Sequence, residues 1–203
     1  MKLALPTMPE ATNPEYSCVN TGGVETEVGQ FLYGLVRLTK PLRILETGTH
    51  KGISASYMAT ALKENGKGSL TTIEFDPGNC NESLALFTAL MLNPYVQVMQ
   101  MDAATYPVTP DEFDIIFLDT EPHLRFAEFV RYFPALKPGG FIGIHDLGPH
   151  LGQNGLTVNG LLNWPFGPLP AEMKEMLKQV QSFHFPSPRG FYLGQKRKAG
   201  FYE

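Results

Sequence analysis

Residues 44–52, ILETGTHKG, decide the fold, because they join an apolar strand to a turn with two glycines four positions apart. The strand ends in the carboxylate of Glu46, and Gly48 and Gly52 follow it. A dinucleotide-binding fingerprint needs three glycines as GxGxxG, and a phosphate loop needs Gly-Lys followed by Ser or Thr. This stretch has neither pattern, and the Glu46 carboxylate would repel a phosphate. It therefore predicts a ligand that carries no pyrophosphate.

Segments that favour strands alternate with segments that favour helices along most of the chain. Apolar residues recur at helical spacing from Val24 to Leu38, and Pro41 marks the end of that helix. Strands are expected at residues 42–47, 69–73, 95–100, 113–118 and 141–144, and helices at 24–38, 53–63, 82–92 and 125–136. This alternation predicts a doubly wound, mostly parallel α/β sheet with right-handed crossovers and helices on both faces.

Both ends of the chain and one long segment stand outside this alternation. Residues 1–23 hold three prolines and are interpreted as an N-terminal arm that could fold over a site. Residues 147–170 are rich in glycine and proline without a period, which predicts a lid loop on the substrate side. A helix at 171–180 and a β-hairpin at 182–186 and 191–195 bring the expected sheet to seven strands. A length of 203 residues fits a single domain.

Composition limits the classes of function. The chain carries 16 Lys and Arg against 20 Asp and Glu, for a net charge of -4. Nucleic-acid binding is therefore disfavoured, because it needs many Lys and Arg contacts to phosphates. Cys18 and Cys80 lie outside any metal-binding spacing and are expected to be free thiols in a reducing compartment. No signal peptide or membrane span is recognised, which predicts a cytoplasmic protein without a membrane partner.

Acidic residues follow the ends of the expected strands: Glu46, Glu74, Asp102, Asp119 and Asp146. In a doubly wound sheet, ligands bind outside the carboxyl ends of the strands. A ligand with a cationic group and a ribose but no phosphate suits this edge, and S-adenosylmethionine is such a molecule. Gly48 would let the backbone approach it, and the helix start near Ser54 can receive its carboxylate. Glu74 can accept hydrogen bonds from the ribose hydroxyls, and Asp102 from the adenine amino group.

Five stretches in order, residues 29–62, 70–77, 99–106, 113–120 and 136–146, resemble the motifs of class I S-adenosylmethionine-dependent methyltransferases. More narrowly, the chain from Gly29 to Asp146 is similar to the small O-methyltransferases related to catechol and caffeoyl-CoA O-methyltransferases. The resemblance implies a Rossmann-like methyltransferase sheet. It also implies a set of cofactor-binding residues, namely Glu46, Gly48, Thr49, His50, Gly52, Ser54, Glu74, Asp102, Ala103 and Asp119.

The resemblance also bears on metal binding and catalysis. In the metal-dependent members, the positions of Asp119 and Asp146 hold a divalent ion such as Mg²⁺, which makes these two residues the candidate metal ligands. This chain departs from that pattern, because Leu147 replaces the usual Asn and the catalytic Lys expected shortly after Asp119 is absent. His123 and His145 are then the local candidates for a base. The expected catalytic residues are His145, Asp146, His123 and Asp119, although each histidine could instead be structural and each aspartate could cap a turn.

The leading hypothesis is S-adenosylmethionine-dependent O-methylation of a small hydroxylated molecule. An alternative is a catalytically degenerate S-adenosylmethionine-binding protein with a regulatory or scaffold role. Methylation of nucleic acid is disfavoured by the acidic composition. A homodimer is left open, and the methyl acceptor cannot be read from the sequence because the arm and the lid, which would select it, lie outside the resemblance.

Overall fold

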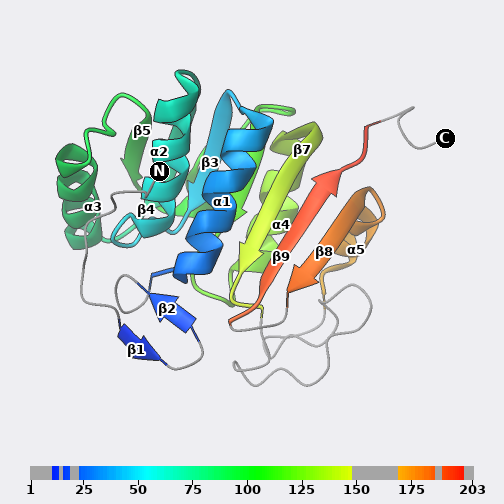
Figure 1. Ribbon diagram of the computed structural model, residues 1–203. Coiled ribbons are helices and arrows are strands. Elements are labelled where there is room, and N and C mark those ends of the chain that lie inside the picture. Colours follow the sequence, from blue (N-terminus) through cyan, green and yellow to red (C-terminus); the bar gives the residue numbers. More distant parts are fainter. Residues whose placement is uncertain (1–10, 14–15, 19–22, 148–168, 186–188, 199–203) are drawn as a thin grey trace.

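The computed structural model describes residues 11–13, 16–18, 23–147, 169–185 and 189–198 of the chain (Figure 1). Its centre is a seven-stranded sheet in the order β5-β4-β3-β6-β7-β9-β8. The strands are β3 (Arg43–Thr47), β4 (Ser69–Glu74), β5 (Val96–Gln100), β6 (Phe113–Leu118), β7 (Leu136–His145), β8 (Val180–Phe185) and β9 (Phe191–Lys196). The first five are parallel, and β9 is antiparallel to both β7 and β8. The predicted fold class is confirmed.

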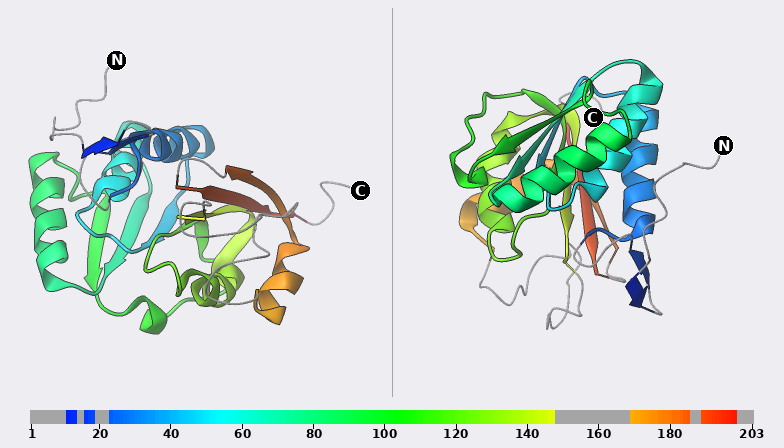
Figure 2. Two further views of the ribbon diagram at one scale, coloured as in Figure 1. Left: turned by 90° about the horizontal axis from the view of Figure 1, so that it is seen from below. Right: turned by 90° about the vertical axis from the view of Figure 1, so that its left-hand side faces the viewer.

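Helices cover both faces of this sheet (Figure 2). The helices α1 (Thr26–Thr39) and α2 (Ile53–Asn65) pack on one face, with α3 (Pro77–Ala89) beside α2 near the edge strand β5. The helices α4 (Arg125–Tyr132) and α5 (Ala171–Leu177) cover the other face. Each face has its own buried apolar cluster, and β6 is apolar except at Asp114, as a strand buried on both sides requires.

Three element boundaries differ from the expectation by four residues or more. Helix α3 begins at Pro77 instead of residue 82, because the Asp76 side chain accepts a hydrogen bond from the Asn79 N–H and Pro77 occupies the first turn. Helix α4 ends at Tyr132, where Pro134 lies in a 3₁₀ turn over Phe133–Ala135. Strand β7 starts at Leu136 instead of residue 141.

The two segments outside the alternation are described only in part. In the expected arm, β1 (Ala11–Asn13) and β2 (Tyr16–Cys18) form a small antiparallel sheet. It lies at the same edge as the carboxyl ends of the parallel strands (Figure 1). Most of the expected lid, residues 148–168, falls outside the described residues. No helix in the described part of the chain is both long enough and apolar enough to span a bilayer.

Candidate functional site

A cavity of about 840 Å³ opens at the carboxyl ends of the parallel strands. The loops after β3, β4, β5 and β6 line it, together with Gly23, Val24, Asp146 and Arg189. Its volume suits a drug-sized ligand, and its place at the carboxyl edge is where doubly wound sheets bind ligands. A smaller pocket of about 380 Å³ lies at the opposite edge beside Pro41 and Lys137. It contains none of the predicted site residues, so the functional site is placed in the larger cavity.

The glycine turn after β3 forms part of the cavity wall. Gly48 has a φ of 82°, and a Cβ at this position would lie 2.2 Å from the carbonyl oxygen of Asp119. The N–H groups of Gly48 and Thr49 both donate to the carbonyl of Ile73, which fixes the turn against β4. Only glycine allows this left-handed backbone to pass so close to the β6 loop. Gly52, also at a φ of 82°, then starts α2 without lining the cavity.

Glu46 lies beneath the turn and does not reach the cavity. Its side chain is 0% exposed, and it accepts hydrogen bonds of 2.5 Å from the hydroxyls of Ser54 and Thr72. Thr49 completes this buried network through a 2.6 Å hydrogen bond between its hydroxyl and that of Thr72. Burial raises the pKa of Glu46 to about 8, in spite of the hydrogen bonds from Ser54 and Thr72. The structure therefore favours a supporting role for Glu46, which holds Ser54 at the cavity, over the expected contact with ligand.

The raised pKa of the buried Glu46 carboxyl predicts how the unfolding free energy changes with pH. Because its pKa is about 8 in the folded chain against 4.5 for the unfolded reference, the folded state binds the proton more tightly. The unfolding free energy should fall by up to about 5 kcal/mol as the pH rises from 4.5 to 8. Urea unfolding of wild type and Glu46→Gln at pH 5 to 8 measures this, because the variant lacks the ionisation. The variant should gain stability relative to wild type as the pH rises; a difference that does not change with pH would contradict the assignment.

Two other strand-end carboxylates are held in place at the cavity. Glu74 accepts from the backbone N–H of His50 at 2.6 Å and from that of Asp76 at 2.9 Å. Asp102 accepts from the N–H of Ala104 at 2.8 Å and caps a short 3₁₀ helix that starts at Ala103. Backbone donors thus fix both side chains while each keeps oxygen lone pairs for a ligand.

Eight of the ten expected cofactor residues line this one cavity. They are Gly48, Thr49, His50, Ser54, Glu74, Asp102, Ala103 and Asp119. The other two, Glu46 and Gly52, lie behind it and shape the turn. The structure thus brings together residues that are up to 71 positions apart in the sequence, between Gly48 and Asp119.

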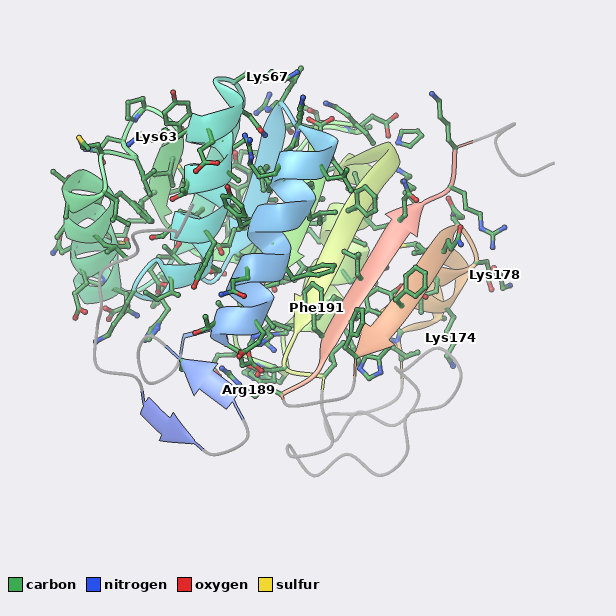
Figure 3. All side chains as sticks on the ribbon, in the orientation of Figure 1. Lys63, Lys67, Lys174, Lys178, Arg189 and Phe191 are labelled. Carbon is green, nitrogen blue, oxygen red and sulfur yellow. The ribbon has the colours of Figure 1, made fainter. Side chains whose placement is uncertain are left out.

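Six charged residues form an ionic cluster at the floor of the cavity: Glu25, Asp119, Arg125, His145, Asp146 and Arg189. The Arg125 Nη2 lies 2.9 Å from Asp119 Oδ1 and 3.1 Å from Asp146 Oδ2, so it bridges the two aspartates. Arg189 forms an ion pair with Asp146, in which its Nε lies 2.7 Å from Oδ1 and its Nη2 lies 2.8 Å from Oδ2. In Figure 3, Arg189 lies at the carboxyl edge of the sheet, below the start of α1 and near Phe191 of β9.

His145 sits inside this cluster with both ring nitrogens engaged. Its Nδ1 lies 3.0 Å from Asp119 Oδ1 and its Nε2 lies 2.6 Å from Glu25 Oε2. Burial works against a charged imidazole, but the charge of Asp119 and the hydrogen bonds with Asp119 and Glu25 raise the pKa of His145 to about 9. The ring is therefore an imidazolium that donates from both nitrogens, and it has no lone pair to accept a proton. This geometry favours a positioning role for His145 over the predicted role of base.

The other predicted catalytic residues are placed as follows. Asp119 and Asp146 both line the cavity, and their carboxylates belong to the ionic cluster. His123 is exposed and is not among the residues that line the cavity. The structure thus joins three of the four predicted catalytic residues and leaves His123 outside.

The candidate metal site does not fit a divalent ion. One ligand atom each of Asp119, His145 and Asp146 lie within 4.8 Å of one another, a spacing that a metal could use. However, the Arg125 Nη2 already lies between the two aspartates, and both ring nitrogens of His145 face carboxylate oxygens, those of Asp119 and Glu25. A divalent ion would have to displace the guanidinium and break these contacts, so no reaction step is derived through a metal here.

Four residues of the site were not predicted from the sequence: Glu25, Arg125, Glu128 and Arg189. Arg125 follows the end of strand β6 by seven residues, and its position as the first Lys or Arg after Asp119 was the one available signal. Glu128, three positions later on α4, also lines the cavity, and it accepts from the hydroxyls of Thr120 at 2.7 Å and Thr47 at 3.2 Å. Burial raises the pKa of Glu128 despite these hydrogen bonds.

Comparison with known proteins agrees with this geometry. The model of a family described as "Methyltransferase domain" matches residues 45–147, which is half of the chain. The chain therefore belongs to this family of methyltransferase domains, and the predicted resemblance to class I methyltransferases is confirmed.

The individual relatives named next share between 20% and 28% sequence identity with the chain. A protein of Mycobacterium sp. (strain JLS), provisionally named an O-methyltransferase, is 28% identical over 130 residues, which are 63% of this chain and 58% of that protein. The chain thus spans less than two thirds of the length of this curated relative. An O-methyltransferase from Bacillus cereus in complex with SAH superposes with a TM-score of 0.71 at 21% identity, covering 88% of this chain and 84% of the other. TomG from Streptomyces achromogenes, an O-methyltransferase involved in tomaymycin synthesis and solved with SAM, gives 0.68 at 20%, covering 87% and 82%.

Proposed function

We propose that the protein binds S-adenosylmethionine in the large cavity and transfers its methyl group to an oxygen of a small molecule. The observation that carries this proposal is the pair of fixed carboxylates, Glu74 and Asp102, next to a glycine turn at the carboxyl edge of the sheet. The absence of a phosphate-binding loop in the turn supports a cofactor without phosphate. The family membership and the named relatives support the same reading.

The cavity offers a partner for each polar part of this cofactor. Glu74 would accept hydrogen bonds from the ribose hydroxyls, and Asp102 with Ala103 would lie at the adenine. Ser54 at the start of α2 and Asp119 after β6 would hold the methionine part, because a helix N-terminus favours a carboxylate and an aspartate favours an ammonium. When bound, S-adenosylmethionine supplies an electrophilic methyl group on its sulfonium.

The protein must then align the acceptor and remove its proton. Glu128 suits the second task, because its carboxyl lines the cavity and burial raises its pKa above the ordinary value, which makes it a stronger base. Asp119 and Asp146 are proposed to act through the ionic cluster, which fixes their side chains at the cavity floor. The predicted base His123 would need to move from its exposed position to take part.

The remaining parts of the proposal concern the methyl acceptor and the cellular location of the protein. A cavity of about 840 Å³ suits the cofactor with a small hydroxylated acceptor. The acidic composition supports a small molecule over nucleic acid. The free thiols of Cys18 and Cys80 accord with the expected cytoplasmic location. The relatives named above are described as O-methyltransferases, so the alternative of a degenerate binding protein finds no support among them.

Transfer of a labelled methyl group tests the catalytic half of this proposal. Purified protein is incubated with S-adenosylmethionine labelled in its methyl group and a panel of phenols, carboxylic acids and aliphatic alcohols. We expect label in at least one product, and the Asp102→Asn variant, with its weakened adenine contact, should need more cofactor for the same rate. Cofactor binding without any labelled product across the panel would instead favour the degenerate alternative.

A further inference from the structure

We infer that Arg125, supported by Arg189, stands where a divalent cation would bind, so that this site works without a metal. The Arg125 Nη2 atom lies between Asp119 Oδ1 and Asp146 Oδ2, at 2.9 and 3.1 Å. Asp119 and Asp146 are the two aspartates that would share an ion. The guanidinium therefore takes both the position and the positive charge that a metal would supply.

Arg125 is also locked in this place by its other hydrogen bonds. Its Nε donates to the carbonyl of Thr120 at 2.8 Å, and its Nη1 donates to the carbonyl of His145. The residue is 2% exposed, so water does not compete for these contacts. A guanidinium presents its donors in a rigid fork and stays charged at any relevant pH. The Arg125 side chain therefore stays between the two aspartates when a metal ion is present in solution.

The charge balance of the ionic cluster gives an independent reason. Two guanidiniums, those of Arg125 and Arg189, already lie against the carboxylates of Asp119 and Asp146. A divalent cation added between these aspartates would stand directly beside two fixed positive charges, which a buried, low-dielectric environment strongly disfavours.

The local sequence agrees with this arrangement. Leu147, at the position next to Asp146 where the metal-dependent pattern has Asn, is a fully buried apolar residue of the core and offers no ligand atom. Arg189 reaches Asp146 from the start of β9, 43 residues away, and also donates to the carbonyl of Gly23 at 2.7 Å. The cationic groups thus come from two separate segments that converge on the same aspartate.

Binding of Mn²⁺ tests the inference without any substrate or cofactor. Paramagnetic broadening of the His145 ring signals in the NMR spectrum reports an ion within the cluster. For the wild type we expect no selective broadening of these signals at substoichiometric Mn²⁺ and no rise in melting temperature. Selective broadening of His145 in the wild type, removed by Asp119→Asn, would overturn the inference.

The Arg125→Ala variant provides the positive arm. It loses the guanidinium between the aspartates and gains space there, so it should bind Mn²⁺ and melt about 3 to 6 °C higher at a Mn²⁺ concentration ten times the dissociation constant. Arg131→Ala, at an exposed residue of the same helix that lines the cavity outside the ionic cluster, is the matched control and should show no shift. A folded Arg125→Ala variant that ignores Mn²⁺ would also overturn the inference. If this variant does not fold, as circular dichroism would show, the wild-type measurement decides alone.

Removal of metal ions with EDTA gives a further test, which rests on the proposed function because it measures the rate of methyl transfer. If methyl transfer is measured, its rate should not change after exhaustive treatment with EDTA, and a rate that falls and returns with Mg²⁺ would contradict the inference. Failure of the proposed function would leave this arm without a signal, whereas the Mn²⁺ measurements would still decide the metal question.

Discussion

Replacing Gly48 with alanine is expected to abolish cofactor binding and to lower the unfolding free energy by about 3 kcal/mol or more. The added Cβ would lie 2.2 Å from the carbonyl oxygen of Asp119 and 2.8 Å from the N atom of Thr120. Both are backbone atoms of the β6 loop and cannot rotate away, and the φ of 82° is itself unfavourable for alanine. The β3 and β6 loops must therefore separate, which moves the cavity wall. Urea unfolding and calorimetric titration with S-adenosylmethionine measure the two effects.

Gly66→Ala is the matched control for this substitution. Gly66 also has a positive φ, 68°, but nothing lies within 4 Å of its added Cβ, and it ends α2 far from the cavity. It should lose only about 1 kcal/mol from backbone strain and bind cofactor normally. Equal losses in the two variants would show that the close approach to Asp119 is not what requires Gly48.

Replacing Arg125 with alanine is expected to lower the unfolding free energy by about 3 to 5 kcal/mol, because it leaves buried carboxylates without their shared partner. Arg125 holds Asp119 and Asp146 together and ties the β6 loop to β7 through the His145 carbonyl. Arg125→Lys should rescue little of this loss, since a lysine cannot bridge both aspartates and donate to the carbonyls as well. Urea unfolding at pH 7 measures both variants.

Arg131→Ala serves as the control, because it lies on the same helix but is exposed and donates to the carbonyl of Tyr106. We expect a change within about 1 kcal/mol for this variant. An Arg125→Ala loss no larger than that of Arg131→Ala would mean that the ionic cluster contributes little to the fold.

The sequence was most informative where local chemistry and topology agree. Glu74, Asp102 and Asp119 were predicted as site residues because they end parallel strands, and parallel strands place their carboxyl ends at one edge. All three line the cavity. Glu46 satisfied the same rule, yet its side chain turns beneath the loop to Ser54 and Thr72. The rule identifies the edge of the sheet but not the direction in which a side chain points.

The ionic cluster shows why the other residues of the site could not be predicted from the sequence. Glu25 and Arg189 lie 164 residues apart in the sequence, yet the Arg189 N–H donates to the Glu25 carboxylate. Glu25 also contacts His145, and Arg189 also contacts Asp146. Nothing in the local sequence of either residue signals this meeting, because it depends on how the start of α1 and the start of β9 pack across the strand ends. The absence of the Lys and the Asn near Asp119 and Asp146 was visible in the sequence, but the Arg125 guanidinium between these two aspartates was not.

Calorimetric titration with S-adenosylmethionine tests the central claim most directly. We predict one binding site in the wild type and a loss of about 100-fold in affinity for Glu74→Ala, which removes the acceptor of two hydrogen bonds to charge. Glu82→Ala, which removes an exposed carboxylate paired with Lys51 on the surface, should bind as the wild type does. Absence of binding to the wild type at millimolar cofactor, or equal affinity in all three proteins, would contradict the proposed site.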